Sequence, residues 1–564
     1  MKNGAIPARL ALSVLLMAGS AGAVPPSGKP GAASDAATTA AAHEAAKGDA
    51  LLEALLTELD RSKAQLKMDQ VQAPYYIEYR VNDVDNFDAE AAFGAVRQSE
   101  RSHVRFLRVV VRIGDYKQDS FYGQGIGSAT ILPLDSDPIA LRRQIWLLTD
   151  EAYKSAADAY AEKLSALKQF SVDPNPVDDF ARAPVVSMVG ETAHLKFDEG
   201  DWNKTLQEVT DLYRQYPEVQ SVIAAARFTS VNEYLVNSEG SIVRQGHTAA
   251  RVAMSSSTQA EDGMRLGRDP AWAEQRPEDL PPREELLKES RKMLETLRAL
   301  REAPMVEESY RGPVLFSPDA ADDVVGGLIG GNVLGRKPQP GRPNRTTGAF
   351  ATSYKTRVLP KFVSVVDDPT MKKFAGKNLI GSYEVDSEGV KAEKVTVVND
   401  GMLENYLLGR QPLRDLPSSN GHGRATPGGP PQPSLGVLLV KSSEPESTKA
   451  LNDKLKEMAA VQNKAYGYRV ETLGPGYSPR LLYRVYVNDG HEELVRGAVF
   501  NELDVRALRN DVSALGDDPL VSNRIGGLPQ TIICPSLLFD ELEVKRADTT
   551  KEKLPEYPAP GLKK

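Results

Sequence analysis

The chain has 564 residues, of which 41% are hydrophobic and 26% charged, and its formal net charge is −8. This length predicts more than one domain, and this composition is typical of a chain that buries a core and stays in solution. The negative charge and the absence of a long basic block argue against nucleic acid as a partner. A single cysteine excludes an intrachain disulfide.

The first 23 residues have the three parts of a secretory signal peptide. Lys2 and Arg9 are basic, residues 10–18 (LALSVLLMA) form a short apolar run, and small residues (AGA) end at Ala23. We expect cleavage near Ala23 and export of a soluble chain to the periplasm or the cell exterior. The next segment, 24–48, is rich in Pro, Gly, Ala, Ser and Thr and predicts a flexible tether. No later segment is apolar for long enough to span a membrane.

Residues 49–303 predict an N-terminal domain that mixes α and β structure. Apolar residues recur at helical spacing in several segments, and the expected helices are 51–59, 137–167, 201–213 and 283–301. Aromatic and β-branched residues predict strands at 75–81 and 103–115, and a β-meander over 219–255 that turns at 237–240.

Near residue 304 the pattern changes to strands joined by long loops, which predicts a β-rich C-terminal domain over 304–548. Asn399-Asp400-Gly401 joins two apolar runs within 394–409, a strong hairpin signal. The loop 411–434 is rich in Pro and Gly, and loops of that length are usually functional or disordered. The other expected elements are one helix within 443–464, strands at 481–487 and 493–500, and a frayed tail at 549–564. The predicted fold class is therefore α+β with two domains.

The stretch DDVVGGLIGGN, residues 322–332, is rich in glycine and contains no histidine or cysteine. A phosphate loop is excluded because Gly330 and Gly335 are followed by Arg336 and Lys337, with no Ser or Thr for Mg²⁺. A dinucleotide fingerprint is excluded because no two of these glycines are two residues apart. Taken alone, the stretch predicts a helix or turn whose glycines allow close packing.

The surroundings of this stretch resemble a known family. The segments RGPVLFSPDAADDVVGGLIGGNVLG, VTVVNDGMLENYLLG, SSNGHGRA, EELVRGAVFNELDVRALRNDVSALGDDP and PSLLFDELEV occur in order over 312–544. Together they resemble the C-terminal half of the TldD/PmbA family, peptide-processing proteins once described as modulators of DNA gyrase. The resemblance implies a two-domain architecture and a dimer with an enclosed cavity.

The resemblance also implies what the glycines replace. One kind of family member carries HExxxH on a helix, whose histidines bind zinc and whose glutamate acts on the metal-bound water, with a later cysteine as a ligand. The other kind lacks this motif and partners the first. Laid on the pattern from Pro313, the motif positions fall on Gly326, Gly327 and Gly331. Glycine can neither ligate zinc nor act as a base, so the resemblance implies no catalytic residue, no metal ligand and no cofactor; zinc is expected only if this assignment is wrong.

The loop SSNGHGRA offers the remaining candidate site. Asn420, His422 and Arg424 have donors and acceptors suited to a peptide backbone or a carboxylate, although an ordinary solvated loop is the alternative. A rebuilt zinc site would need three ligands to converge. The other histidines, which we expect to be surface or internally bonded residues, are His43, His103, His194, His247 and His491. Cys534 has apolar neighbours and is expected to be a buried hydrophobe.

Three functions remain open. The first is an exported, metal-free protein that binds peptide or unstructured polypeptide, or supports a catalytic partner. Such a chain would form a homodimer, or a heterodimer with a related chain that carries HExxxH. The second is an active peptidase with an atypical site. The third is an exported structural or surface-binding module.

Overall fold

The computed structural model describes residues 40–169, 176–307, 309–338 and 348–548. The predicted signal peptide, most of the predicted tether and the predicted frayed tail lie outside these residues. The tether prediction extends to residue 48, but residues 40–46 are helical and bury Ala42 and Ala46. Alanine has the highest helix propensity, so this alanine-rich segment becomes helical where a neighbouring core can cover one side.

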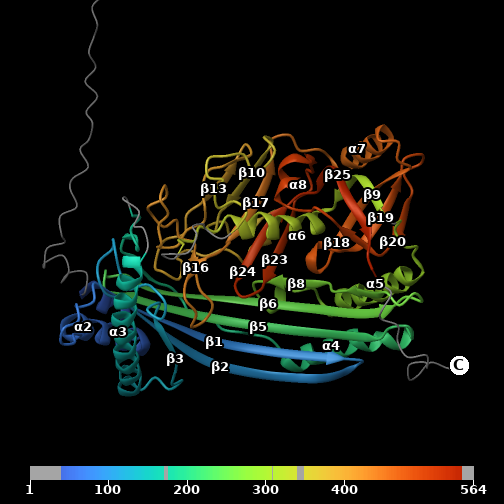
Figure 1. The fold of residues 1–564 in the computed structure, drawn as a ribbon. Coiled ribbons are helices and arrows are strands. Elements are labelled where there is room, and N and C mark those ends of the chain that lie inside the picture. Colours follow the sequence, from blue (N-terminus) through green and yellow to red (C-terminus); the bar gives the residue numbers. More distant parts are fainter. Residues whose placement is uncertain (1–39, 170–175, 308, 339–347, 549–564) are drawn as a thin grey trace, which may run out of the picture.

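Four long antiparallel strands dominate the N-terminal domain and lie side by side beneath the C-terminal domain (Figure 1). They are β1 (Tyr76–Ala92), β2 (Ala95–Arg112), β5 (Ser221–Asn237) and β6 (Ile242–Gln259). Within the described residues the sheet has the order β3-β2-β1-β5-β6-β4, and two short strands also pair with β6. The shorter strands are β3 (Ser128–Leu132), β4 (Ser187–Val189), β7 (Arg265–Arg268) and β8 (Ala271–Glu274).

The sequence-based prediction of β1 and β2 was wrong in length. We expected strands at 75–81 and 103–115, but the hairpin extends through Phe93 and Gly94, whose φ values of 51° and 76° make a tight turn. The added parts carry many charged residues, and residues 95–103 of β2 are exposed. Pairing with β5, which no local pattern reveals, holds the outer half of β1 in the sheet.

Helices cover one face of this sheet, and its four long helices were predicted. They are α2 (Ala50–Gln65), α3 (Pro138–Gln169), α4 (Glu199–Asp211) and α5 (Arg283–Glu302). Side chains alternate between the faces of a strand, and odd-numbered residues of β1 such as Tyr79 and Phe87 pack into the cores beneath the helices. The even-numbered residues of β1 therefore face the C-terminal domain.

The described part of the C-terminal domain contains two main sheets. One has the order β14-β13-β10-β17-β24-β23, and the other has the order β20-β19-β18-β9-β25-β21, with β22 also paired to β25. The strands of the first sheet are β10 (Val363–Asp367), β13 (Val395–Asn399), β14 (Met402–Leu403), β17 (Val437–Ser442), β23 (Leu520–Ile525) and β24 (Pro529–Cys534). The strands of the second are β9 (Ser309–Phe316), β18 (Tyr466–Leu473), β19 (Pro479–Tyr486), β20 (Glu492–Val495), β21 (Ala498–Phe500), β22 (Val512–Leu515) and β25 (Leu537–Arg546).

Short elements complete this domain. They are the two-residue strand pairs β11 (Lys373–Phe374) with β12 (Lys377–Asn378) and β15 (Gly423–Arg424) with β16 (Gln432–Pro433), and the helices α6 (Pro318–Leu328), α7 (Thr448–Val461) and α8 (Val505–Asn510). Helix α6 packs against β18 of one main sheet and β24 of the other. The glycine-rich stretch therefore lies at the centre of the domain.

Local predictions in this domain are confirmed where turn chemistry is strong. The hairpin forms between β13 and β14, with positive φ at Asp400 (46°) and Gly401 (79°). The strand predicted at 481–487 is β19, and that predicted at 493–500 is divided into β20 and β21 at Gly497. The predicted α+β fold with two domains is confirmed. Within the described ranges, no helix combines the length and apolar character needed to cross a membrane.

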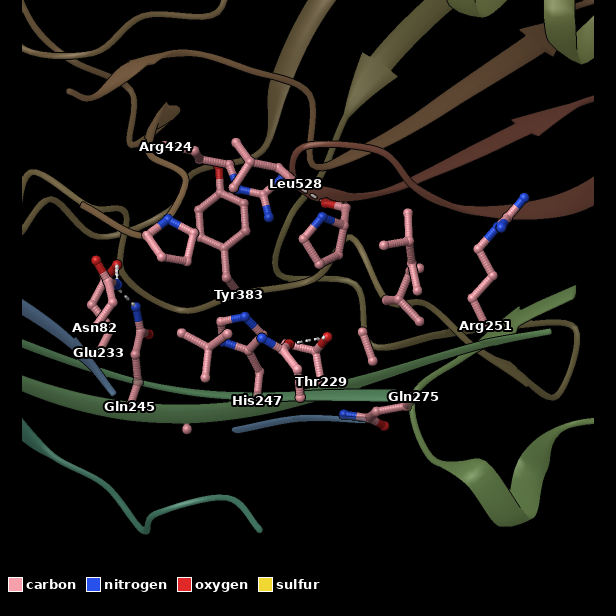
Figure 2. A pocket seen from close by; sticks show the side chains of 18 of the residues that line it. Asn82, Thr229, Glu233, Gln245, His247, Arg251, Gln275, Tyr383, Arg424 and Leu528 are labelled. Carbon is pink, nitrogen blue, oxygen red and sulfur yellow. Dashed lines mark hydrogen bonds between the residues drawn. The ribbon is translucent and has the colours of Figure 1, made fainter. Parts of the chain in front are cut away.

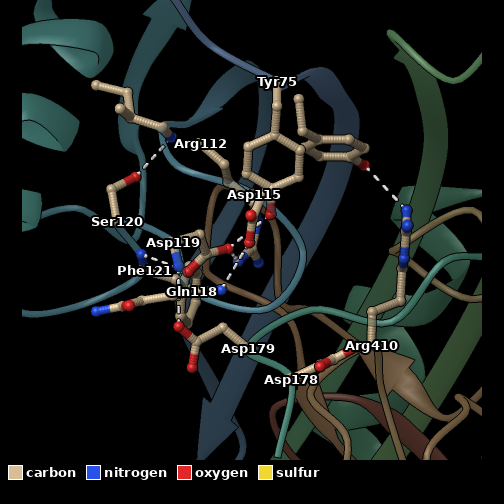
Figure 3. A network of polar contacts seen from close by, with 12 residues as sticks. Tyr75, Arg112, Asp115, Gln118, Asp119, Ser120, Phe121, Asp178, Asp179 and Arg410 are labelled. Carbon is tan, nitrogen blue, oxygen red and sulfur yellow. Dashed lines mark hydrogen bonds and ion pairs between the residues drawn. The ribbon is translucent and has the colours of Figure 1, made fainter. Parts of the chain in front are cut away.

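Buried charges join the two domains. Arg410 donates from both terminal nitrogens to the carboxylate of Glu239, at 2.8 Å each, and also to the carbonyl of Ala181. Figure 3 shows this arginine beside a network centred on the buried ion pair between Arg112 and Asp119. The N-terminal sheet and the C-terminal loops are thereby held in one arrangement.

Candidate functional site

A cleft of about 1350 Å³ lies between the open face of the N-terminal sheet and loops of the C-terminal domain (Figure 2). Its floor is formed by β1, β5 and β6, and its opposite wall by residues around Tyr383, Arg424 and 525–529. The volume exceeds the range of about 300–1,000 Å³ that is typical of small-molecule pockets. The cleft is therefore large enough for a chain of several residues.

Strand register places polar side chains in rows across the floor. Asn82, Glu233 and Gln245 are aligned partners on β1, β5 and β6. Asn82 and Gln245 both donate to the Glu233 carboxylate, and Ser387 from the opposite wall donates to it at 3.2 Å. Gln245 also donates to the Val385 carbonyl at 2.8 Å. This row closes one end of the cleft and joins its two walls.

A second row lies further along the same strands. Asp88, Arg227 and Arg251 are aligned on β1, β5 and β6, and Arg227 forms an ion pair with Asp88. Arg251 has no ion pair or hydrogen bond within the part of the chain that the structure describes. Burial lowers the pKa of Arg251, and the neighbouring Arg227 lowers it further.

His247 lies on the floor between these rows, aligned with Val231 of β5. Neither ring nitrogen has a hydrogen-bond partner among the described residues, and the imidazole faces the cleft (Figure 2). The side chain is exposed to the cleft, yet the surrounding walls desolvate it, and this desolvation lowers the pKa of His247. The carboxylate of Glu233 acts to raise the pKa of His247, and the positive charge of Arg424 lowers it further. Groups on the floor and on the opposite wall therefore both affect this imidazole.

Arg424 reaches the cleft from the opposite wall. Its Nη1 donates to the carbonyls of Leu435 (2.6 Å) and Pro529 (2.7 Å), and its guanidinium lies over the Tyr383 ring at 4.7 Å. Desolvation lowers the pKa of Arg424, although Tyr383 and several carboxylates act against this effect. Within the described ranges, no carboxylate forms an ion pair with this guanidinium.

The structure separates the three peptide-binding candidates. Arg424 lines the cleft, whereas His422 is fully buried and contacts Asn420 through Nδ1 and Asp367 through Nε2. Asn420 accepts from the Leu408 amide at 2.8 Å and donates to the Tyr406 carbonyl at 2.9 Å. Asn420 and His422 thus have internal partners that shape the wall from which Arg424 projects.

The three motif positions do not fit a zinc site. Gly326 and Gly327 lie on α6, but the α-helix ends at Leu328 and Gly331 belongs to a short 3₁₀ turn. A Cβ added at Gly327 would lie 1.9 Å from the Tyr477 hydroxyl. A Cβ at Gly326 would lie 2.7 Å from Ile532 Cδ1 and 3.4 Å from a guanidinium nitrogen of Arg524. Protein atoms therefore occupy the space into which motif side chains at 326 and 327 would project.

Asp322 and Asp323 hold Arg524 beside this helix. The guanidinium forms ion pairs with both carboxylates, and Asp322 is fully buried. Burial raises the pKa of Asp322 to about 7, although Arg524 opposes this effect. A cationic side chain thus lies next to Gly326, where family resemblance would place the first metal-binding histidine.

The other candidate ligands lie apart. Cys534 is buried, as expected, and burial raises the pKa of its thiol. His43, His103 and His491 contact Asp60, Asp83 and Asp489, and His194 contacts Thr192. Throughout the described ranges, no group of three or more His, Cys, Asp or Glu side chains is placed to hold a metal ion.

The floor of the cleft was not predicted from the sequence. His247 lies in a strand, as expected, but it was expected to be an ordinary surface or internally bonded residue and not part of a site. The available signal was the alternation in β5 and β6, where Thr229, Glu233, Gln245, His247 and Arg251 all lie on one face. That face is covered by loops from a distant part of the chain, and strand periodicity does not reveal them.

Comparisons with known proteins agree with this architecture. Residues 309–546 match the family described as PmbA/TldA metallopeptidase C-terminal domain. The chain is 35% identical over 69 residues to a metalloprotease of Archaeoglobus fulgidus, covering 12% of this chain and 15% of that protein. It is 28% identical over 189 residues to metalloprotease PmbA of Escherichia coli, covering 33% of this chain and 38% of that protein. The matches thus span less than half the length of these relatives.

The fold is also similar to the crystal structure of TldE from Thermococcus kodakarensis. The TM-score is 0.57 at 14% identity, and the similarity covers 87% of this chain and 99% of that one. At this identity the comparison supports the fold alone. The family relationship rests instead on the matched C-terminal domain and on the order of its segments. Residues 309–546 of this chain carry the C-terminal domain of the TldD/PmbA family.

Proposed function

We propose that this chain binds unstructured polypeptide in the cleft between its domains and has no metal-dependent peptidase activity of its own. The observation that carries the proposal is the cleft itself, which is larger than a small-molecule pocket and has polar side chains on both walls. An extended chain exposes its backbone donors and acceptors, and rows of polar side chains can pair with them. The family relationship to metalloproteases agrees with a polypeptide ligand.

The residues at the three motif positions support the proposed absence of catalysis. Gly326, Gly327 and Gly331 supply no ligand or base, and Arg524 with its two aspartates occupies the neighbouring space. In this proposal the chain acts as a homodimer, or as the binding partner of a related chain that carries HExxxH. The proposed location is the periplasm or the cell exterior, after cleavage near Ala23, on the evidence of the N-terminal sequence.

The test uses the chain without residues 1–23. Fluorescence anisotropy measures the binding of a short, labelled, unstructured peptide, and mass spectrometry follows its integrity with and without a chelator. Elemental analysis measures zinc. We expect binding, an intact peptide and no stoichiometric zinc. Chelator-sensitive cleavage would indicate an active peptidase instead, and the absence of any binding would favour a structural module.

Two glycine substitutions locate the binding. Gly526 lines the cleft, and a Cβ at Gly526 or at Gly331 would have no atom within 4 Å. Gly526→Trp should fill part of the cleft and weaken binding, whereas Gly331→Trp, outside the cleft lining, should not. Equal affinities of the two variants would place the ligand elsewhere.

A further inference from the structure

Several carboxylates on the walls of the cleft have partners within the protein. Asp88 pairs with Arg227, and Glu384 pairs with Lys372. Asp386 accepts from backbone amides, including that of Gly423 at 2.8 Å. The cleft therefore contains acidic groups that are already bonded.

The guanidinium of Arg424 and the imidazole of His247, at the centre of the cleft, are different. The Nε and Nη2 atoms of Arg424 have no hydrogen-bond partner within the described residues, and His247 has none at either ring nitrogen. The carboxylate of Glu233 acts to raise the pKa of both groups, but it already accepts hydrogen bonds from Asn82 and Ser387. A desolvated guanidinium without a counter-charge is unfavourable unless something else pairs with it.

Arg424 and His247 project into the cleft from opposite walls (Figure 2). The two groups are close enough for the positive charge of Arg424 to disfavour protonation of His247. A carboxylate between them could accept from the free edge of the guanidinium and from one imidazole N–H. Few groups of a polypeptide other than a carboxylate carry a negative charge.

We propose that Arg424 and His247 form a subsite for a carboxylate of the bound polypeptide, either its free C-terminus or an acidic side chain. This inference rests on the proposed function, since it names the part of the polypeptide that is recognised. Arg251 is the natural control. It is also without a partner in the described residues and lies on the same face of β6, but four residues from His247, or about 13 Å along the strand.

The experiment compares one labelled, unstructured peptide in three forms: with a free C-terminus, with a C-terminal amide, and as the amide with one glutamate added. Charge-assisted hydrogen bonds are strong enough for the free acid to bind at least about tenfold tighter than the amide. If the amide with glutamate binds as the free acid does, the subsite takes acidic side chains as well. If it binds as the plain amide does, the subsite takes the C-terminus.

Variants test the two residues separately. His247→Ala breaks no internal hydrogen bond and should reduce the preference for the free acid to near unity. Arg424→Lys keeps the positive charge but loses the planar edge of the guanidinium, so it should strongly reduce the preference for the free acid. Arg251→Gln should retain the preference. Arg424 also donates to the carbonyls of Leu435 and Pro529, so its lysine variant could fold poorly. In that case the His247→Ala variant alone tests whether the subsite exists.

The inference is overturned if the parent chain binds acid and amide equally, if His247→Ala keeps the preference, or if Arg251→Gln loses it. Equal binding leaves the proposed function standing. If no peptide form binds, both proposals are wrong.

Discussion

Asp322 lies one helical turn before Gly326, and its side chain is fully buried. Its Oδ1 has no hydrogen-bond partner in the described residues, while Oδ2 accepts from Arg524. Burial raises the pKa of this carboxyl to about 7 despite the arginine. When Asp322 is ionised and paired with Arg524 beside α6, burial of its charge therefore lowers the stability of the folded chain.

We expect Asp322→Asn to remove a pH-dependent loss of stability. In the unfolded chain this carboxyl titrates near pH 4, so folding binds a proton between about pH 4 and pH 7. The free energy of unfolding of the parent chain should fall as the pH rises through this window. In the variant this fall should be smaller by up to about 4 kcal/mol. Urea unfolding across the window measures this difference. Asp323→Asn, at the more exposed partner of Arg524, is the control, and a pH-independent difference for Asp322→Asn would reject the assignment.

A second residue-scale prediction concerns Asn420. Its amide contacts Leu408 and Tyr406 of the protein itself, so Asn420→Ala leaves two backbone groups unpaired. The free energy of unfolding should fall by about 1–3 kcal/mol, while the folded variant keeps its peptide affinity. Urea unfolding and fluorescence anisotropy check the two effects. Unchanged stability with weakened binding would show instead that Asn420 contacts the peptide.

At the scale of elements, α6 explains why the motif cannot simply be restored. The α-helix ends at Leu328, so positions 326 and 331 do not lie on one regular helical face. A third zinc ligand is also missing from the described surroundings. The geometry needed for a catalytic zinc, three fixed ligands and an open position, is not provided by this element.

The triple variant Gly326→His, Gly327→Glu, Gly331→His should therefore show no chelator-sensitive peptidase activity. It should also unfold at lower urea concentration, because Tyr477 and Ile532 must move away from the new side chains. Gly331→His alone, which meets no atom within 4 Å, is the control for stability. Cleavage of a labelled peptide by the triple variant, abolished by chelator, would contradict this prediction.

At the scale of the whole molecule, buried arginines fix the two domains around the cleft. Arg80 of β1 is fully buried and donates to the carbonyls of Ser387 and Gly429, and Arg410 pairs with Glu239. Removing one partner of a buried ion pair leaves the other charge uncompensated. The cleft walls should therefore separate when this pairing is lost.

Arg410→Ala should lower the free energy of unfolding by about 3–5 kcal/mol and weaken peptide binding, since the walls are no longer held together. Chemical unfolding followed by two spectroscopic probes, with peptide anisotropy, measures both effects. Arg311→Ala, at an exposed ion pair with Glu541, is the control and should change neither. Wild-type stability in Arg410→Ala would show that the domains are held by other contacts.

The exported form is predicted to begin near Val24. The basic start, short apolar run and small residues before the cleavage point determine this expectation. Mass spectrometry of the protein recovered from its native host measures the N-terminus. Retention of residues 1–23 would contradict export by cleavage.

The amino-acid sequence alone was enough to predict four long helices, one hairpin turn and the family relationship. Helical spacing predicted α2, α3, α4 and α5, and Asn399-Asp400-Gly401 predicted the β13–β14 turn, because both signals act between residues close in the chain. The order of segments over 312–544 predicted the family, which the C-terminal domain match confirms. The identity of Gly326, Gly327 and Gly331 also follows from the sequence alone.

The position of the candidate site depends on contacts between segments that are distant in the sequence. His247 becomes a cleft residue only because β6 turns one face toward loops more than a hundred residues later in the chain. The loop 411–434 gains its shape from distant partners, such as Asp367 for His422 and Pro529 for Arg424. Periodicity and turn chemistry report on neighbours along the chain. Burial, desolvation and the lack of a partner depend on which distant segments pack together, and those properties define the site.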